Sequence, residues 1–511
     1  MGLGRVSAAK RNILFGYVGQ LATALMSFVL RTVFILRLSE TLLGVNGLYT
    51  NILSLLSMAE LGIGTALNFS LYAPVARKDT EKIKSYMQMY RRCYFAIACV
   101  VAGIGILLIP LLPYIIKNPG TLTTRELTLY YLIFLFNTVS TYFVSYKYSL
   151  VNAEQRNYIQ TNINTLTKVI TVLLQIIVLL TTRNFLAYLL TDAAVQLTQK
   201  IFVSGYLNRL YPFLKEKNIQ KLSKEESGEV WRKTRALVLH KVGDVARLQT
   251  DALIISAFIE VAVVGMVDNY TLVINTVSNF VNIIFNSVIS SFGNLIATES
   301  REKQFQLFKV YRFFASWIYG YFYVGFFVLL TPLIRLWLGE TWILPGAAIG
   351  CLLTDFYFKG DRIVLSNYKT AAGVFEQDKY LALIQGGVNL VISIALVQRI
   401  GLTGIYVGTI VSGLIANVTK PIIIYRVCFD KSALSYFAES VRYIGVTAAC
   451  VLICSLIGGR VLTTVTIPGF LGMGVLITVL FNGSFLLLFG RSEPCRYLFA
   501  KLRGRLGRAE G

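Results

Sequence analysis

Long apolar runs recur along the whole 511-residue chain and constrain its fold more than any other feature of the sequence. Two of them are "ACVVAGIGILLIPLLPYII" from Ala98 and "FLGMGVLITVLFNGSFLLLFG" from Phe470. A run of about 20 apolar residues can cross a bilayer as one helix. Because backbone groups in lipid must hydrogen-bond within the protein, these runs predict an all-α polytopic membrane protein.

The runs divide into fourteen expected spans, of which the second and the eighth are long enough to project beyond the bilayer. With the N-terminus placed in the cytoplasm, only six of the 49 Lys and Arg residues fall in outer loops. This bias follows the positive-inside rule and predicts that both termini are cytoplasmic. The expected spans lie near residues 12–36, 45–74, 88–111, 126–146, 158–180, 186–208, 236–257, 262–297, 313–336, 345–365, 381–398, 403–425, 443–459 and 467–490.

The same bias accounts for most of the formal net charge of +23, so the charge requires no nucleic-acid partner. The C-terminal "RYLFAKLRGRLGR" is predicted to lie against anionic headgroups. The seven cysteines fall in spans or on the inner side and imply neither a disulfide nor a metal site. The sequence has no GxxxxGK[ST] loop and no large catalytic loop, which argues against ATP hydrolysis and against an enzyme.

Two halves of the chain resemble each other. The stretches "LGVNGLYTNILSLLS" and "VGMVDNYTLVINTVS" align without gaps at an offset of 221 residues. Chance helix composition could give some of the matches, but it explains less readily the charged and aromatic pairs outside the apolar part. The matches are Gly44 with Gly265, Tyr49 with Tyr270, Thr50 with Thr271, Ser57 with Ser278, Glu81-Lys82 with Glu302-Lys303, and Tyr90-Arg91 with Tyr311-Arg312.

An offset of this length covers six spans, an even number, so the two copies would have parallel topology and a symmetry axis along the membrane normal. We expect two pseudo-symmetric six-helix lobes with two added helices, and alternating access through a cleft between the lobes. The predicted domains are an N-lobe (1–211), a cytoplasmic linker (212–235), a C-lobe (236–427), two further spans (428–490) and a basic cytoplasmic tail (491–511).

Several expected spans contain charged residues. In "HKVGDVARLQTDALII" four of the five ionisable residues, His240, Asp244, Arg247 and Asp251, are spaced four, three and four apart, which places them on one face of the seventh span. A charge at the bilayer centre costs about 2.5–3.5 kcal/mol on insertion scales, so such residues need a wet cleft, a ligand or an ion partner. The candidate cavity cations are Arg31, Lys168, Lys200, Lys241, Arg247 and Lys359. The coupling-ion or ion-pair candidates are Glu60, His240, Asp244, Asp251 and Asp355.

Alternative roles stay open for some of these residues. His240 and Lys241 lie near the inner surface and could snorkel, and Asp244 could form a structural ion pair with Arg247. The deep cations of the N-lobe outnumber its acids, which favours an anionic solute. Phosphate fits best, because Arg can bind it in a bidentate manner. The Tyr-, Asn- and Gln-rich spans add the hydrogen-bonding and stacking surface that sugars need.

The stretches "LGVNGLYTNILSLLSMAELGIGTALNFSLYAPVARKDTEKI", "YKYSLVNAEQRNYI", "HKVGD" and "TDALIIS" also carry a family resemblance. They resemble bacterial polysaccharide flippases of the Wzx type, within the multidrug/oligosaccharidyl-lipid/polysaccharide superfamily. The resemblance extends over nearly the whole chain and is specific for the family, not for a substrate. Within this motif Glu60 lies beside Gly62 and Gly64, and it could equally be a capped acid at a packing contact.

The resemblance implies two six-helix bundles around a central cationic cavity. It implies that the protein moves undecaprenyl-diphosphate-linked oligosaccharides from the inner to the outer leaflet of the bacterial cell membrane, for capsule, exopolysaccharide or O-antigen assembly. No cofactor is expected beyond a coupling Na⁺ or H⁺, and the expected partners are the lipid-linked sugar, membrane lipids and a polysaccharide polymerase. The alternatives are a lipid II-type flippase, whose extra helices the last two spans resemble, and a multidrug/cation antiporter.

Overall fold

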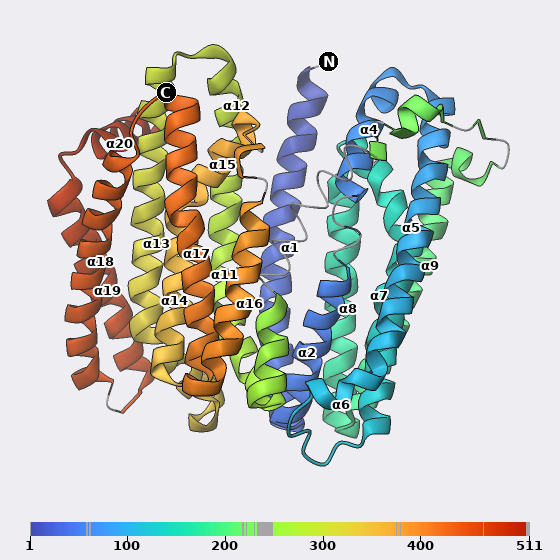
Figure 1. Ribbon diagram of the computed structural model, residues 1–511, viewed down its shortest axis with the longest axis horizontal. Coiled ribbons are helices and arrows are strands. Elements are labelled where there is room, and N and C mark those ends of the chain that lie inside the picture. Colours follow the sequence, from blue (N-terminus) through green and yellow to red (C-terminus); the bar gives the residue numbers. More distant parts are fainter. Residues whose placement is uncertain are drawn as a thin grey trace. The chain divides into compact units, whose positions relative to one another are not determined.

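The computed structural model is helical throughout its regular elements, which confirms the expected all-α fold class (Figure 1). The chain divides into two compact units, Met1–Gly265 and Met266–Gly511. The expected boundaries of the lobes, linker and tail stay predictions. The structure describes residues 2–57, 60, 63–216, 219–220, 222–228, 230–231, 249–374, 376–378, 380–462 and 464–506.

The first unit is built around one helix pair and one group of three helices. Helix α1 packs along α8, and α7 packs against both α5 and α9. Its helices are α1 (Gly2–Arg37), α2 (Glu40–Leu56), α4 (Ile63–Arg77), α5 (Thr80–Leu108), α6 (Leu112–Ile115), α7 (Thr124–Ala153), α8 (Asn157–Thr182) and α9 (Phe185–Leu210).

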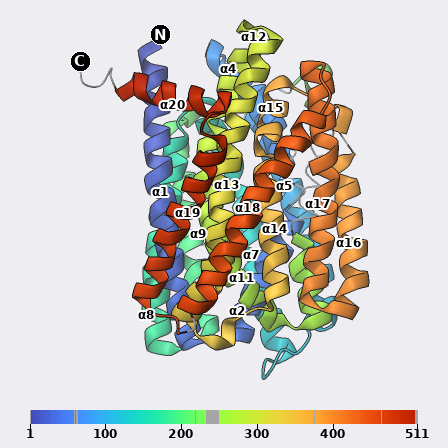
Figure 2. The same ribbon diagram turned by 90° about the vertical axis from the view of Figure 1, so that its left-hand side faces the viewer.

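In the second unit α13 packs against α14, α18, α19 and α20, while α16 and α17 form a close antiparallel pair. Figures 1 and 2 both show α18 and α19 lying beside α13. The helices are α11 (Val261–Asn286), which begins at the end of the first unit, α12 (Val288–Thr298), α13 (Arg301–Leu338), α14 (Gly346–Asp361), α15 (Ile363–Ala372), α16 (Leu381–Ile400), α17 (Leu402–Ile424), α18 (Leu434–Val461), α19 (Ile467–Phe489) and α20 (Glu493–Leu506).

Within the described ranges, ten helical stretches are long and apolar enough to cross a membrane. They coincide with ten of the fourteen expected spans. Of the other four, 345–365 lies on the two shorter helices α14 and α15, and the described parts of 45–74 include α2 and α4. The span 186–208 lies on α9, whose charged residues lower its mean hydropathy. The seventh expected span, 236–257, lies outside the described residues up to position 248.

The expected linker around residues 398–403 is even shorter than its sequence suggests, because α16 and α17 are separated by Gly401 alone. Gly401 has φ +57° and ψ −137°. A side chain would clash with the backbone in this conformation, whereas glycine adopts it readily. One glycine therefore allows two spanning helices to reverse direction without a loop.

The internal repeat also appears in the helix boundaries. Helices α2 and α11 begin at Glu40 and Val261, which are one repeat offset apart. The N-caps of α5 and α13, Asp79 and Ser300, are separated by the same offset. Each accepts a hydrogen bond from the backbone N–H three residues on, at 3.1 Å for Asp79 and 3.5 Å for Ser300. The two units therefore start corresponding helices at corresponding residues.

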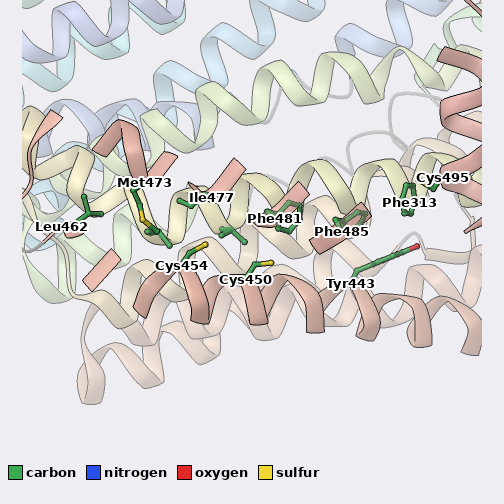
Figure 3. Packing of buried hydrophobic residues seen from close by; sticks show 12 residues of the cluster. Phe313, Tyr443, Cys450, Cys454, Leu462, Met473, Ile477, Phe481, Phe485 and Cys495 are labelled. Atoms are coloured by element: carbon green, nitrogen blue, oxygen red, sulfur yellow. The ribbon is translucent and has the colours of Figure 1, made fainter. Parts of the chain in front are cut away.

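The helices beyond the repeat are held to α13 by an apolar cluster, shown in Figure 3. Phe485 stacks on Trp317 with ring centroids 5.5 Å apart. Cys450 and Cys454, one helical turn apart on α18, are 2% and 0% exposed and serve as small packing residues.

A buried arginine fastens α18 more specifically. Arg312 on α13 is 1% exposed, and its guanidinium lies 3.5 Å from the ring centre of Tyr436. Its Nη1 donates to the Glu439 carboxylate at 2.6 Å. Its Nη2 donates to the Tyr436 carbonyl at 2.6 Å and to Ser440 Oγ at 2.7 Å. Helix α18 thus supplies three oxygen acceptors to this guanidinium.

The described part of the expected cytoplasmic linker is tied to the first unit. Glu216 binds the Lys84 ammonium at 2.5 Å, and Glu226 binds that of Lys82 at 2.6 Å. Both lysines lie in the first turns of α5. The linker therefore runs along this end of α5 at these two points.

Candidate functional site

A polar cavity of about 550 Å³ lies within the first unit, between α1, α7, α8 and α9. Apart from Gly19, Val144 and Val203, every residue that lines it carries a polar side chain. Most of these are glutamine, asparagine, threonine or serine. The charged lining residues are Lys168 and Lys200, both of which the sequence had indicated as cavity cations.

Helical spacing explains why the cavity is polar. On α8, Gln160, Asn164 and Lys168 follow each other at intervals of four residues, so their side chains share one face. Leu166 and Leu173 on the same helix are 62% and 50% exposed and lie outside this lining. Each helix therefore turns amides and hydroxyls toward the cavity and leaves leucines for the apolar surroundings.

Lys200 is anchored by α7. It is 7% exposed, and its ammonium donates to the Asn137 carbonyl at 2.8 Å and to Ser140 Oγ at 2.7 Å. Asn137 in turn donates from Nδ2 to the Asp192 carboxylate at 3.1 Å. The Lys200 ammonium is thus held by two neutral oxygens, and Asn137 links it to the Asp192 carboxylate.

Lys168 belongs to the same electrostatic group. It is half-buried, attracted by Asp192 and repelled by Arg31. Lys200 also feels the attraction of Asp192. Lys168 and Lys200, two cations that the sequence indicated, therefore lie near one carboxylate, and Arg31, a third, lies near Lys168. Arg31 does not itself line the cavity, so the two lysines are the cations that a bound solute would meet there.

Glu60 lies in a separate part of the first unit. It lines a second hollow of about 440 Å³ together with Thr50, Ser57 and Gln249. It is also within hydrogen-bonding reach of the Tyr94 hydroxyl. The structure does not bring Glu60 into the lysine cavity.

Four of the candidates, His240, Lys241, Asp244 and Arg247, lie outside the described residues. Their expected common face therefore stays a prediction. Asp251, the fifth charged residue of that stretch, is half-buried in the helical segment 249–259. It lines neither the polar cavity nor the hollow beside Glu60.

The two candidates of the second unit pair with each other. Lys359 Nζ lies 2.6 Å from the Asp355 carboxylate, one turn earlier on α14. Asp355 is 4% exposed, whereas the Lys359 side chain is 44% exposed. The Lys359 ammonium thus neutralises the buried Asp355 carboxylate, and each residue finds its ion partner within α14.

Two basic residues escaped the sequence analysis because the expected spans end next to them. Lys147 follows the end of the fourth expected span by one residue, and Arg312 precedes the ninth by one. The structure buries both, at 5% and 1% exposure. The internal repeat could have drawn attention to Arg312, because this residue matches Arg91 at the repeat offset.

No protein-family model matches the sequence, and neither does any curated protein. Solved structures do match. A structure of the lipid II flippase MurJ in an inward closed conformation matches 94% of this chain and 100% of its own, with a TM-score of 0.68 and 12% identity. An inward-facing MATE-family multidrug resistance transporter matches 79% of this chain and 96% of its own, with a TM-score of 0.58 and 13% identity.

A point mutant of the Vibrio cholerae MATE transporter VcmN matches 84% of this chain and 99% of its own, with a TM-score of 0.54 and 17% identity. This chain has the fold of MurJ and the MATE transporters. At such identities the likeness establishes the fold, and it agrees with the expected multi-pass membrane architecture. The substrate has to be argued from the cavity.

Proposed function

We propose that this protein is a flippase that moves undecaprenyl-diphosphate-linked oligosaccharide repeat units from the inner to the outer leaflet of a bacterial cell membrane. The observation that carries the proposal is the lysine-containing polar cavity of the first unit. A lipid-linked sugar combines an anionic diphosphate with many hydroxyl groups. The cavity wall offers the complementary chemistry, two ammonium groups within a surface of amides and hydroxyls.

In this proposal Lys168 and Lys200 bind the diphosphate as point charges. Arg31 adds to the positive potential from beside the cavity. Amides such as those of Gln160 and Gln196 exchange hydrogen bonds with sugar hydroxyls, since an amide can both donate and accept. The polyprenyl tail stays in the lipid while the headgroup crosses.

Transport would follow alternating access, driven by an ion gradient or the membrane potential. The candidates for binding the coupling Na⁺ or H⁺ are Glu60, Asp251 and Asp355 among the described residues. His240 and Asp244, outside the described residues, are the others. The product would feed capsule, exopolysaccharide or O-antigen assembly, with a polysaccharide polymerase as the next partner. Both termini are proposed to be cytoplasmic.

A lipid II-type flippase is the second candidate, favoured by the match to MurJ over nearly the full length of both chains. Its substrate shares the lipid diphosphate, so the two candidates need the same cations. A multidrug/cation antiporter fits less well, because the charged residues that line the cavity are lysines and repel organic cations.

The test is transport by the full-length protein in vesicles, with a fluorescent undecaprenyl-diphosphate oligosaccharide and, in parallel, fluorescent lipid II. Losing one charged hydrogen bond costs about 1.5–3 kcal/mol, so Lys168→Gln should weaken substrate binding by about tenfold or more. Lys168→Arg should keep most of the transport. Arg125→Gln removes an exposed charge at the start of α7 and should leave transport unchanged.

Normal transport of both lipids by Lys168→Gln and Lys200→Gln would refute the role of the cavity. Transport of lipid II alone by the native protein would select the second candidate. Arrival at the far leaflet should be measured with and without an imposed potential, because that comparison also reveals the coupling.

A further inference from the structure

A basic pocket of about 640 Å³ opens on the first unit between α5, α7 and α9. It shares no lining residue with the polar cavity. Arg91 and Arg92 of α5 and Lys147 of α7 line it, and none of its lining residues is acidic. In an adjoining hollow of about 450 Å³ the acid is Glu216, whose carboxylate is already bound by Lys84 at 2.5 Å.

The cations of this pocket have only neutral partners in the described part of the chain. Lys147 is 5% exposed, and its ammonium donates to Ser204 Oγ at 2.7 Å and to Asn208 Oδ1 at 2.9 Å. Arg91 and Arg92 are exposed, and they have no ion pair or hydrogen bond to any described residue. A buried ammonium without a carboxylate, beside two guanidinium groups, is unfavourable unless an anion joins them.

The internal repeat shows how the second unit provides an anionic partner for the corresponding arginine. Arg312 occupies the position that corresponds to Arg91, and it is buried under α18. Glu439, Ser440 and the Tyr436 carbonyl of that helix supply its oxygen acceptors. Helix α18 lies beyond the repeated part of the chain. The first unit carries the arginine and two more cations, no described residue gives them a carboxylate, and an anionic group of another molecule can take that role.

The other molecule must also suit an apolar surface. Phe95 follows Arg91 by one helical turn, and Phe143 precedes Lys147 by one turn. Both rings line the pocket, are 57% and 50% exposed, and lie 6.3 Å apart between centroids. Along the helix direction, the basic part of the pocket is thus followed by the two phenylalanine rings. This pairing is complementary to an amphiphile, whereas a soluble anion would leave the rings uncovered.

We propose that this pocket binds the phosphate headgroup of an anionic phospholipid, with an acyl chain lying along Phe95 and Phe143. The two arginines bind phosphate oxygens through paired N–H donors, and Lys147 adds a buried point charge. The distribution of basic residues predicts that this end of α5 faces the cytoplasm, so the lipid would come from the inner leaflet.

The test uses the purified full-length protein in a neutral detergent, titrated with phosphatidylglycerol, phosphatidylcholine or soluble glycerol phosphate. Phosphatidylglycerol should raise the unfolding midpoint in a saturable manner, and the two other probes should not. The double variant Arg91→Gln/Arg92→Gln should need about tenfold more phosphatidylglycerol or higher, since it loses charged hydrogen bonds. Phe95→Ala/Phe143→Ala should also weaken the response to the lipid.

Arg209→Gln is the matched control, because it removes an exposed charge from the last turn of α9 without touching the pocket. Its titration should match that of the native protein. An unchanged response of the arginine double variant would overturn the proposal, as would equal stabilisation by glycerol phosphate. Saturable displacement of the lipid by a transmembrane peptide with the sequence of α18, which contains Glu439, at higher affinity than the lipid, would assign the pocket to a protein partner and overturn the proposal as well.

Discussion

Replacing Arg312 should weaken the attachment of α18 to the second unit. The Arg312→Leu variant keeps an apolar side chain of moderate size against Tyr436 but removes three hydrogen bonds of 2.6–2.7 Å. Glu439 then loses its cation, and Ser440 and the Tyr436 carbonyl lose a donor. Since α18 is not part of the repeated bundle, its attachment to α13 depends on this contact and on the apolar cluster.

The expected cost follows from burial. Breaking a buried ion pair costs about 3–5 kcal/mol, because one charge is left without compensation. The Glu439 side chain is 31% exposed, so water or headgroups can partly solvate it, and the lower end of about 3 kcal/mol applies. Arg335 on the same helix forms a pair with Glu340 at 2.6 Å, but the side chains are 36% and 69% exposed. Arg335→Leu should therefore cost at most about 1 kcal/mol.

Three cysteines in the apolar cluster can report its opening, because their thiols are buried in the folded protein. Cys450, Cys454 and Cys495 are 2%, 0% and 0% exposed and lie between the helices that should separate (Figure 3). Thermal unfolding in detergent can be followed with a maleimide dye that becomes fluorescent on reacting with these thiols. The remaining thiols must first be removed by the substitutions Cys93→Ser, Cys99→Ser, Cys351→Ser and Cys428→Ser.

Arg312→Leu should lower the temperature at which the cluster thiols react, and Arg335→Leu should leave it nearly unchanged. In a double-mutant cycle, Glu439→Gln should cost much less in the Arg312→Leu background than in the native protein, because the two residues act as a pair. Equal midpoints for the two arginine variants would contradict the reasoning. So would purely additive effects of Arg312→Leu and Glu439→Gln.

Two further predictions concern packing and pH. A Cβ at Gly360 would overlap the ring of Tyr319, so Gly360→Ala should cost about 1–3 kcal/mol, whereas Gly350→Ala on the same helix meets open space and should be neutral or stabilising in a thermal unfolding assay. The hydrogen bond from Lys82 holds the pKa of Glu226 below its usual range. The link therefore contributes stability above the unfolded pKa of the carboxyl and loses it as the pH falls through the folded pKa. Proteolysis of the linker around Glu226, normalised to an unfolded peptide, should accelerate over that pH range, and Glu226→Gln should be cut fast at every pH.

Much of the fold could be predicted from the apolar pattern, because lipid leaves the backbone few alternatives to the helix. The expected spans within the described ranges lie on helices, and the repeat offset recurs in the starts of α2 and α11. Periodicity also indicated the chemistry of the cavity. The interval of four residues from Gln160 to Lys168 places amides and an ammonium on one face of α8.

Pairing between helices could not be read from the sequence. The Lys359–Asp355 pair, at 2.6 Å, has the four-residue spacing at which ion pairs form within one helix, whereas the sequence gives no partner for Lys168, which lines a cavity. Arg91 and Arg312 occupy corresponding positions, yet one is exposed in a basic pocket and the other is buried under α18. Hydropathy and helical spacing are local properties, so the sequence determines which segments are helices and which face of each is polar. Beyond pairs within one helix, such as Lys359 with Asp355, packing between helices distant in the chain decides which charges find a partner and which stay available to a ligand.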